Sequence, residues 1–319
     1  MEMETLRGCS LCGSSRIDSL DAANNICKCR ACGYVFDNPR PAPEEIGGFY
    51  SRPAKYDSWL AEEAARDALW KRRLKKLKRV SKEGSLLDVG SGIGQFLYHA
   101  RPLFAKLSGT EVSDSAIRLA QAKYGVKLIK GGPEEVEAGG EGPFDNVTMF
   151  HVLEHVPNPK ETIQVCRRLL RNGGVLAVAV PNDVLSASRR LRTGMKRLLR
   201  RLGFRRFRET GRLGLRKISL DGSLDEIHLS HFTPFVLKRL LEDSGFRVVE
   251  SSLDPYYVAC GVKLLRCRCC YAFAALVQLV LGRNIYETIW MVGEKAGTKQ
   301  EIVGGSAMGG NANAPCEGV

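Results

Sequence analysis

Three groups of residues in this 319-residue chain have types and spacings that could do chemistry. Residues 88–94 read Asp-Val-Gly-Ser-Gly-Ile-Gly, a glycine-rich run that lets a ligand approach backbone amides closely. Residues 151–157 read His-Val-Leu-Glu-His-Val-Pro, which offers a carboxylate and two imidazoles for proton transfer. Residues 9–12 and 29–32 are two Cys-x-x-Cys pairs, with the ligand spacing of a zinc site.

The glycine run is flanked by the elements that a nucleotide-binding turn needs. Residues 86–89 predict a short buried strand, and a helix is expected to begin at Gln95. The glycines are spaced G-x-G-x-G, with Asp88 before them, whereas a dinucleotide site has G-x-G-x-x-G. Glu111, at the tip of the next expected strand, is placed to accept hydrogen bonds from a ribose diol. The turn therefore indicates a nucleoside-containing cofactor.

The His-x-x-Glu-His run by itself also matches an inverted zinc-protease motif. Such a metal-binding helix runs on for several turns, whereas Pro157 and Pro159 end this one within about a turn. An acid-base pair formed by Glu154 and His155 is the favoured interpretation, and a histidine that only caps the turn is its alternative.

The two cysteine pairs are separated by sixteen residues and predict a zinc ribbon with Cys9, Cys12, Cys29 and Cys32 as ligands. Cys27 is expected not to be a ligand, since Cys29 has the correct spacing to Cys32. A ribbon of this kind can bind nucleic acid or cover a substrate site, but a structural role in a segment too small for its own core is favoured.

Strands and helices alternate after the ribbon, which predicts an α/β fold with a mostly parallel sheet and helices on both faces. Strands are expected at residues 86–89, 106–112, 127–130, 144–150, 175–180, 247–252 and 287–294, and helices at residues 44–80, 115–123 and 162–170. A further helix should begin at Thr233 and Pro234, with the threonine as its N-cap. Residues 71–79 are expected to form a solvated charged face.

The net charge of +13 is concentrated in one segment. Residues 185–217 contain thirteen Arg or Lys and one acid, Glu209, so the rest of the chain is almost neutral. Leu191, Met195, Leu198, Leu199 and Leu202 form one helical stripe there, typical of a cationic helix that contacts an anionic membrane or an acidic partner. A merely solvated lid is the alternative. Nucleic-acid binding has weaker support, because only Phe204 and Phe207 could stack on bases.

Several features bear on where the chain resides. The first residues lack a signal-peptide pattern, and the apolar segment 269–281 is short for a bilayer, so a soluble cytoplasmic protein is expected, with peripheral contact at the inner membrane face through residues 189–208. Cys267, Cys269 and Cys270 are expected to be small buried residues. The tail 298–319 predicts disorder.

These motifs, in this order, resemble the class I S-adenosylmethionine-dependent methyltransferases, and especially sugar and polysaccharide-biosynthesis enzymes with an N-terminal zinc ribbon. The resemblance implies a Rossmann-like, seven-stranded sheet whose last strand is antiparallel. It implies a ribbon over residues 1–40, a methyltransferase domain over 41–297 and a basic lid insertion at 185–220. The cofactor residues that it implies are Asp88, Gly90, Ser91, Gly92, Gly94, Glu111, Gly132 and His151.

By the same resemblance, His155 would act as the base, with Glu154 beside it, and His231 would be a second base facing the acceptor. The predicted reaction is methyl transfer from S-adenosylmethionine to a hydroxyl or carbon atom of a small molecule, sugar, glycan or lipid-linked intermediate, with an anionic acceptor suiting the basic lid. The alternatives are a zinc-ribbon nucleic-acid-binding protein or nucleic-acid methyltransferase, and an NAD-dependent dehydrogenase.

Overall fold

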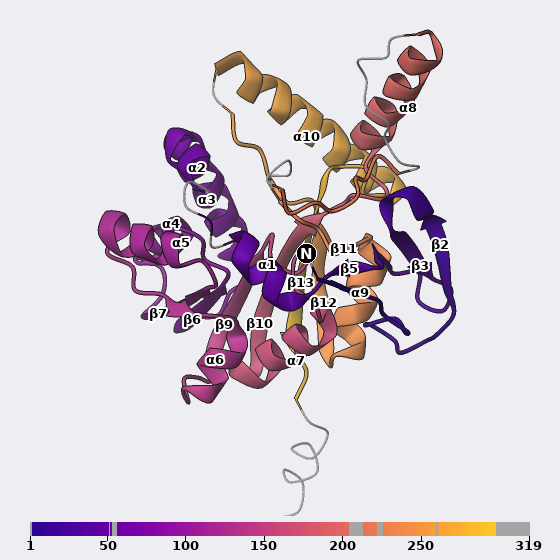
Figure 1. Ribbon diagram of the computed structural model, residues 1–319. Coiled ribbons are helices and arrows are strands. Elements are labelled where there is room, and N and C mark those ends of the chain that lie inside the picture. The colour runs from indigo at the N-terminus through magenta and orange to yellow at the C-terminus, as the bar shows by residue number, and fades with distance from the viewer. Residues whose placement is uncertain are drawn as a thin grey trace, which may run out of the picture.

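A computed structural model describes residues 2–50, 52, 56–203, 213–221, 226–259 and 261–297. Residues 204–212, which include Phe204 and Phe207 of the basic segment, and the tail 298–319 lie outside the described residues, so the predictions made for them stay predictions. Figure 1 shows one large twisted sheet flanked by helices, with a smaller sheet beside it.

The large sheet has seven strands in the order β12-β13-β10-β9-β6-β7-β8. Its strands are β6 (Ser85–Val89), β7 (Lys106–Glu111), β8 (Ile129–Lys130), β9 (Phe144–Phe150), β10 (Leu170–Pro181), β12 (Phe246–Ser252) and β13 (Thr288–Lys295). The strands from β10 to β8 pair in parallel, whereas β13 runs antiparallel to both β10 and β12. The Rossmann-like architecture predicted from the sequence is therefore confirmed, including the direction of the last strand.

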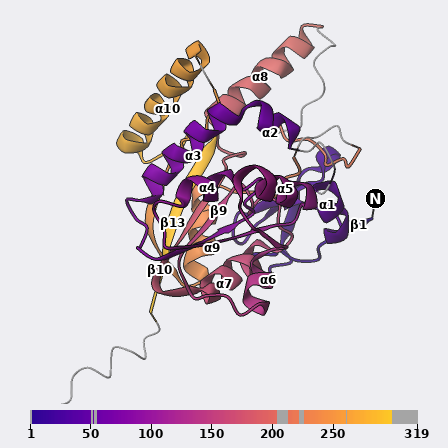
Figure 2. The ribbon, with the colours of Figure 1, turned by 90° about the vertical axis from the view of Figure 1, so that its left-hand side faces the viewer.

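Helices cover both faces of this sheet (Figures 1 and 2). The covering helices are α3 (Glu63–Leu77), α4 (Gln95–Ala100), α5 (Asp114–Leu119) with its continuation η2 (Ala120–Tyr124), α6 (Pro133–Ala138), α7 (Pro159–Leu169) and α9 (Pro234–Asp243). One core includes Trp70, Phe96 and Ala116 from α3, α4 and α5. The other includes Val136, Ile163 and Leu237 from α6, α7 and α9. The predicted cap of α9 is present, because the hydroxyl of Thr233 accepts a hydrogen bond from the amide of Val236 at 3.3 Å.

The N-terminal residues form a second sheet that includes a strand from a distant part of the chain. Its order is β11-β4-β3-β2, with β2 (Ile17–Asp21), β3 (Ile26–Cys29), β4 (Val35–Asp37) and β11 (Ser230–His231). The pair β1 (Met3–Glu4) and β5 (Arg40–Pro41) lies beside it, and η1 (Ala22–Asn24) joins β2 to β3. A hydrogen bond of 2.5 Å between Tyr34 and Ser230 links β11 to the N-terminal segment. The small sheet is therefore continuous with the segment that precedes α9.

The long helix predicted over residues 44–80 is wrong, because three helices occupy that stretch: α1 (Pro43–Tyr50), α2 (Asp57–Ala61) and α3. Pro53 in the intervening sequence lacks the amide hydrogen that a continuous helix requires. The predicted solvated face of residues 71–79 is also wrong in part. Arg73 is 1% exposed, since it forms an ion pair with the buried carboxylate of Asp254.

Arg73 and Asp254 form a buried, two-pronged ion pair. The Nε and Nη2 atoms of Arg73 donate to the two carboxylate oxygens of Asp254, at 3.0 and 2.5 Å. The pair holds the pKa of Asp254 well below its usual range, although burial by itself opposes that shift. The ion pair joins α3 to the segment just after β12, in which Asp254 lies.

Two helices, α8 (Ala187–Arg201) and α10 (Gly261–Leu281), contribute little to either core. The segment expected to be too short for a bilayer belongs to a 21-residue helix, because α10 begins at Gly261 rather than at Cys269. By length and composition α10 could cross a membrane, and 6% of its most apolar stretch is buried. The prediction that its cysteines are buried is wrong, since Cys269 and Cys270 are exposed.

Replacing Arg73 with Met should destabilise the protein by about 3–5 kcal/mol, because it leaves the Asp254 carboxylate buried and unpaired. The double variant Arg73→Met/Asp254→Leu should recover part of the loss, since no charge is then buried. Urea unfolding measures both. Arg168→Ala, which breaks an exposed pair with Glu137, is the control and should cost under about 1 kcal/mol. A loss for Arg73→Met no larger than the control's would contradict the assigned role.

Candidate active site

The glycine turn after β6 approaches other parts of the chain so closely that side chains are excluded. Gly90, Gly92 and Gly94 all have positive φ angles, of 71°, 55° and 75°. A Cβ atom on Gly92 would lie 2.8 Å from the ring of Trp59, and one on Gly90 would overlap Val152. The turn thus has the cradle form predicted from its spacing, and Trp59 of α2 covers it.

Acidic side chains flank this turn, as predicted. The carboxylate of Glu111 accepts hydrogen bonds from the amides of Gly92 at 2.8 Å and Ser113 at 2.9 Å, and burial raises its pKa. Asp88 accepts a hydrogen bond from Thr148 Oγ1 at 2.7 Å, and burial raises its pKa to about 7. These contacts place both acids against the glycine turn, where a nucleoside cofactor would need them.

The other predicted cofactor residues lie near these acids. The amide of Ser91 donates to the carbonyl of Thr110 at 2.8 Å, which fastens the turn to β7. The amide of Gly132 donates to Glu135 at 2.7 Å, and its neighbour Gly131 donates to the carbonyl of Glu111 at 3.0 Å. Gly132 therefore follows directly after Gly131, which is hydrogen-bonded to Glu111 at the end of β7, and it lies beside the predicted ribose site.

The turn after β9 carries a buried carboxylate with no hydrogen-bond donor. Glu154 is 1% exposed, and neither of its carboxylate oxygens accepts a hydrogen bond from the described part of the chain. His151 Nδ1 lies 3.4 Å and His155 Nε2 3.8 Å from its Oε1 atom. Burial by itself raises the pKa of Glu154, but the attraction of its carboxylate to the protonated forms of His155 and His151 outweighs this effect and lowers that pKa. Glu154 and His155 are thus near enough to interact, and the acid-base pair predicted from the sequence stays a prediction.

The ring of His155 is held in one orientation. Its Nδ1 atom faces the carbonyl of Ile227, which can only accept a hydrogen bond, and lies 2.8 Å from the hydroxyl of Tyr50. The Nδ1 atom therefore carries the hydrogen, which leaves Nε2 with the lone pair that can take up a proton. Burial lowers the pKa of His155, which favours this neutral form.

His151 occupies an unusual position between two carboxylates. It has a positive φ angle of 58°, and its Nε2 atom lies 3.5 Å from Asp254 Oδ2. Burial lowers its pKa, but the carboxylates of Asp254 and Glu154 outweigh this and raise it. Its ring centroid lies 4.5 Å from that of Tyr256. The Arg73–Asp254 pair thus helps to position the imidazole of His151 between Asp254 and Glu154.

His231 differs from its predicted role as a second base. Its Nε2 atom donates to Asp37 at 2.9 Å and its Nδ1 atom to Asp183 at 3.2 Å, and it is 3% exposed. Burial lowers the pKa of His231, but these carboxylates outweigh it and raise that pKa. With both nitrogens donating, His231 has no lone pair for a substrate proton. It instead joins β11 to β4 and to the residues after β10.

Three basic side chains contact the carboxylate of Asp183, namely His228, His231 and Arg189. His228 Nδ1 donates to it at 3.0 Å, and Arg189 at the start of α8 forms an ion pair with it at 2.5 Å. Burial opposes ionisation, but His228 and His231 hold the pKa of Asp183 well below its usual range, and the pKa of His228 is correspondingly raised. Asp183 therefore connects the basic helix directly to the histidines.

Several residues of this site were missed by the sequence analysis. Asp183 and Asp254 follow β10 and β12 at the carboxyl edge of the sheet, so the rule that α/β sites form at that edge could have found them. Asp37, Tyr50 and Arg73 have no such signal, because they reach the site from N-terminal elements that precede the large sheet.

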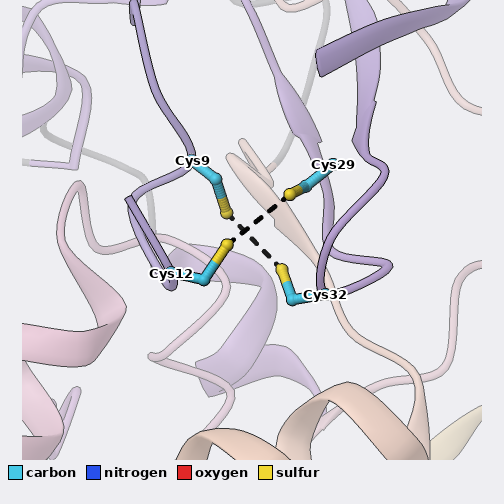
Figure 3. A group of neighbouring side chains, drawn as sticks. All are labelled: Cys9, Cys12, Cys29 and Cys32. Atoms are coloured by element: carbon cyan, nitrogen blue, oxygen red, sulfur yellow. Dashed lines mark hydrogen bonds between the residues drawn. The ribbon is translucent and has the colours of Figure 1, made fainter. Parts of the chain in front are cut away.

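The four predicted zinc ligands converge on one point, as Figure 3 shows. The Sγ atoms of Cys9 and Cys32 are 3.6 Å apart, as are those of Cys12 and Cys29, and all four lie within 4.8 Å of one another. A tetrahedral zinc ion bound to four thiolates requires sulfur atoms about 3.8 Å apart. The residues therefore fit the ion. Cys27 lies outside the cluster, with its Sγ atom 3.5 Å from the carbonyl of Asn38.

A cleft of about 590 Å³ in the described part of the chain lies away from this chemistry. Pro143, Leu170 and Lys295 line it, so it is at the amino edge of the parallel strands, opposite the glycine turn. Its volume gives no reason to place the active site there.

A family of proteins described as having a methyltransferase domain matches residues 58–251 of this chain, which is well over half of its length. The chain is 31% identical over 126 residues to an uncharacterised protein of Methanocaldococcus jannaschii, covering 40% of this chain and 57% of that protein. It is also 31% identical over 121 residues to a ubiquinone biosynthesis O-methyltransferase of Caulobacter vibrioides, covering 36% of this chain and 48% of that enzyme. It thus spans about half the length of these relatives.

Similar solved structures include an S-adenosylmethionine-dependent methyltransferase from Archaeoglobus fulgidus, with a TM-score of 0.46, 18% identity and coverage of 75% of this chain and 99% of that one. A putative methyltransferase from Listeria monocytogenes has a TM-score of 0.49, 15% identity and coverage of 73% and 100%. These scores add nothing to the family assignment. The match over residues 58–251 places the chain in the methyltransferase-domain family.

Proposed function

We propose that this enzyme methylates a hydroxyl group of a small acceptor and that His155 removes the hydroxyl proton. The observation that carries the proposal is the state of His155, whose Nδ1 atom faces a carbonyl while its Nε2 atom lies 3.8 Å from a buried carboxylate. When bound, S-adenosylmethionine supplies an activated methyl group. The chain's own residues then have to hold the acceptor in line and accept its proton.

Each part of the cluster has a distinct task in this proposal. His155 takes the proton at Nε2, and the negative charge of Glu154 stabilises the imidazolium that forms. Tyr50 and the Ile227 carbonyl keep the ring oriented through Nδ1. Asp88, Glu111, Gly132, His151 and the glycine turn, with Ser91, would hold the cofactor. His231 is a positioning residue, because it fixes Asp37 and Asp183 without a free nitrogen of its own.

The acceptor class is also part of the proposal. The O-methyltransferases among the relatives support a hydroxyl acceptor over a carbon acceptor. Support for an anionic acceptor, such as a sugar nucleotide, glycan precursor or lipid-linked intermediate, comes from the basic helix α8, which has seven Arg or Lys residues and no acid. Family membership argues against the NAD-dependent dehydrogenase, and the absence of interleaved aromatic side chains on α8 argues against the nucleic-acid alternative.

We further propose that Cys9, Cys12, Cys29 and Cys32 bind a structural zinc ion. The ion would stabilise the small sheet, which supplies Asp37 to the site. The metal would not take part in the chemistry, since the cysteines occupy all four positions of a tetrahedral site.

Gly92→Ala should weaken the binding of S-adenosylmethionine at least about tenfold, because forcing a methyl group against Trp59 costs ~1–3 kcal/mol. Isothermal titration calorimetry measures the affinity. Gly173→Ala is a matched control: Gly173 also has a positive φ angle, of 73°, but a Cβ atom there meets nothing within 4 Å. Equal affinities of the two variants would contradict the proposed cradle.

His155→Gln should lower the rate of methyl transfer roughly 10²- to 10⁴-fold and leave cofactor affinity unchanged, because it removes the base and no cofactor contact. Tritium transfer from methyl-labelled S-adenosylmethionine to a panel of hydroxylated acceptors measures the rate. His99→Gln, in which an imidazole paired with Asp67 is lost from α4, is the control and should keep full activity. An active His155→Gln enzyme would refute the proposal.

The pH profile of kcat/KM should fall on the acid side with a midpoint below 6.5, because His155 must be neutral and burial lowers its pKa. Glu154→Gln should shift that midpoint to lower pH, since the carboxylate's charge favours the imidazolium. Initial rates measured between pH 4.5 and 8 test both shifts. A shift to higher pH in the variant would show that Glu154 does not act on His155.

The purified protein should contain about one zinc ion per chain, which is lost together with thermal stability in Cys12→Ser. Mass spectrometry of the metal content and a thermal melt test this. Cys27→Ser is the matched control and should retain the ion, because Cys27 lies outside the cluster. Full zinc content in Cys12→Ser would overturn the assignment.

A further inference from the structure

We infer that α8 and α10 together form a docking surface for an anionic lipid bilayer, with α10 lying in the plane of the interface. Figures 1 and 2 show both helices projecting from the same end of the molecule, away from the two cores. We call these two helices the docking surface.

The helix α8 is cationic and presents apolar side chains to solvent. It carries seven Arg or Lys residues and no acid. Leu191, Met195, Leu198 and Leu202 have exposed fractions of 70%, 50%, 52% and 65%. Only Thr193 of α8 is buried. A strongly amphipathic cationic helix with its apolar stripe unpacked has the composition of a helix that lies on a membrane surface.

The helix α10 is more apolar and equally unpacked. Its exposed large side chains are Val262, Leu265, Phe273, Leu276, Leu279, Val280 and Leu281. Leu279 is 83% exposed, although removing a leucine side chain from water is favourable. Ala274 is its one buried residue. Lys263, Arg266 and Arg268 are its only charged residues, so α10 is also cationic. Contiguous exposed apolar surface of this kind marks an interaction site.

Both helices leave the large sheet at the same edge. The chain enters α8 after the carboxyl end of β10, and β12, which runs parallel to β10, leads toward α10. The amide of Ala187 in α8 donates to the carbonyl of Ile285, just after α10, at 3.0 Å. Arg192 of α8 and Glu287 form an ion pair at 2.7 Å. The docking surface is therefore fastened together at its base, on the edge that carries Glu154 and His155.

The topology decides between a helix that crosses the bilayer and one that lies in its interface. The strands on either side of α10 are neighbours, with Ser252 opposite Trp290. Asp254 is held by Arg73, and the Asn284 carbonyl accepts a hydrogen bond from Asn182 at 3.2 Å. Both ends of α10 thus start from one edge of one sheet.

A crossing would need the chain to return through the bilayer. The hydrocarbon layer is about 30 Å thick, so an extended return needs roughly nine residues. Only residues 255–260 and 282–283 lie between the anchors and α10, and non-helical backbone has no partners in lipid. Although its length and composition would allow α10 to cross, the fold constrains it to the interface.

The charge of the docking surface identifies its occupant. Two copies of this chain meeting through α8 and α10 would bring cations against cations, because neither helix has an acid. An anionic bilayer instead offers negative headgroups to the Arg and Lys residues and hydrocarbon to the exposed leucines. A lipid surface rich in anionic headgroups therefore fits both features.

This position has a consequence for the acceptor, which rests on the proposed function. The base, His155, lies at the sheet edge from which the docking surface projects, so the acceptor would be an amphiphilic molecule presented at the membrane. The enzyme would then work as a cytoplasmic protein at the inner membrane face. Docking itself requires no methyl transfer and is tested separately.

The apolar contribution is tested by flotation of the full chain with vesicles of phosphatidylcholine and phosphatidylglycerol at a 7:3 ratio. Partitioning should fall roughly tenfold or more in Phe273→Ser/Leu276→Ser/Leu279→Ser, because those side chains insert into the interface. Phe235→Ser/Val249→Ser, which removes exposed apolar residues of α9 and β12, should partition as the wild type does. Equal loss in both variants would overturn the inference.

The charge contribution is tested by comparison with vesicles of phosphatidylcholine alone, to which binding should be at least about tenfold weaker. Arg190→Glu/Lys196→Glu should reduce binding to the anionic vesicles, and the matched reversal Arg118→Glu/Lys127→Glu should not. Equal binding to both vesicle types would overturn the inference. So would light scattering that shows a dimer which the triple serine variant converts to a monomer. Calorimetric binding of S-adenosylmethionine should be unchanged in every variant, so a failure of docking leaves the proposed reaction standing.

Discussion

The buried carboxylate of Glu154 is the constraint on which the rest of the site depends. An ionised carboxylate removed from water is costly unless charges or hydrogen-bond donors replace the solvent. Here no hydrogen-bond donor from the described chain reaches its oxygens, and imidazoles lie at 3.4 and 3.8 Å instead. One of these, His155, can gain a proton. The negative charge of Glu154 is therefore best compensated when His155 has taken up a proton from the substrate.

The surrounding fold explains how this arrangement persists. The amides of Leu229 and Ser230 donate to the backbone carbonyl of Glu154, at 2.8 and 3.1 Å, which fastens the segment before α9 to the turn after β9. The same segment forms β11 and so joins the small cysteine-containing sheet to the site. Asp37 and Asp183 then hold His231 from opposite sides. The N-terminal sheet thus forms part of the wall of the candidate active site.

Much of the fold could be predicted because it depends on local chemistry. The strand at residues 144–150 agrees with β9 at both ends, and Thr233 and Pro234 mark the start of α9 as expected. The burial of Arg73 could not be predicted, because its partner is 181 residues away and a cationic run is normally solvated. The role of His231 could not be predicted for a similar reason, since it depends on Asp37 from another sheet. The extent of α10 was missed because its cationic first turns interrupt the apolar pattern.

The proposed reaction requires His155 to be neutral, protonated at Nδ1 and free at Nε2, while His231 is a cation held by two carboxylates. The ¹⁵N chemical shifts of the imidazole nitrogens at pH 7 test this directly in the cofactor-free protein. We expect one protonated and one bare nitrogen for His155, with the hydrogen on Nδ1, and two protonated nitrogens for His231. A charged His155, or one that carries its hydrogen on Nε2, would contradict it.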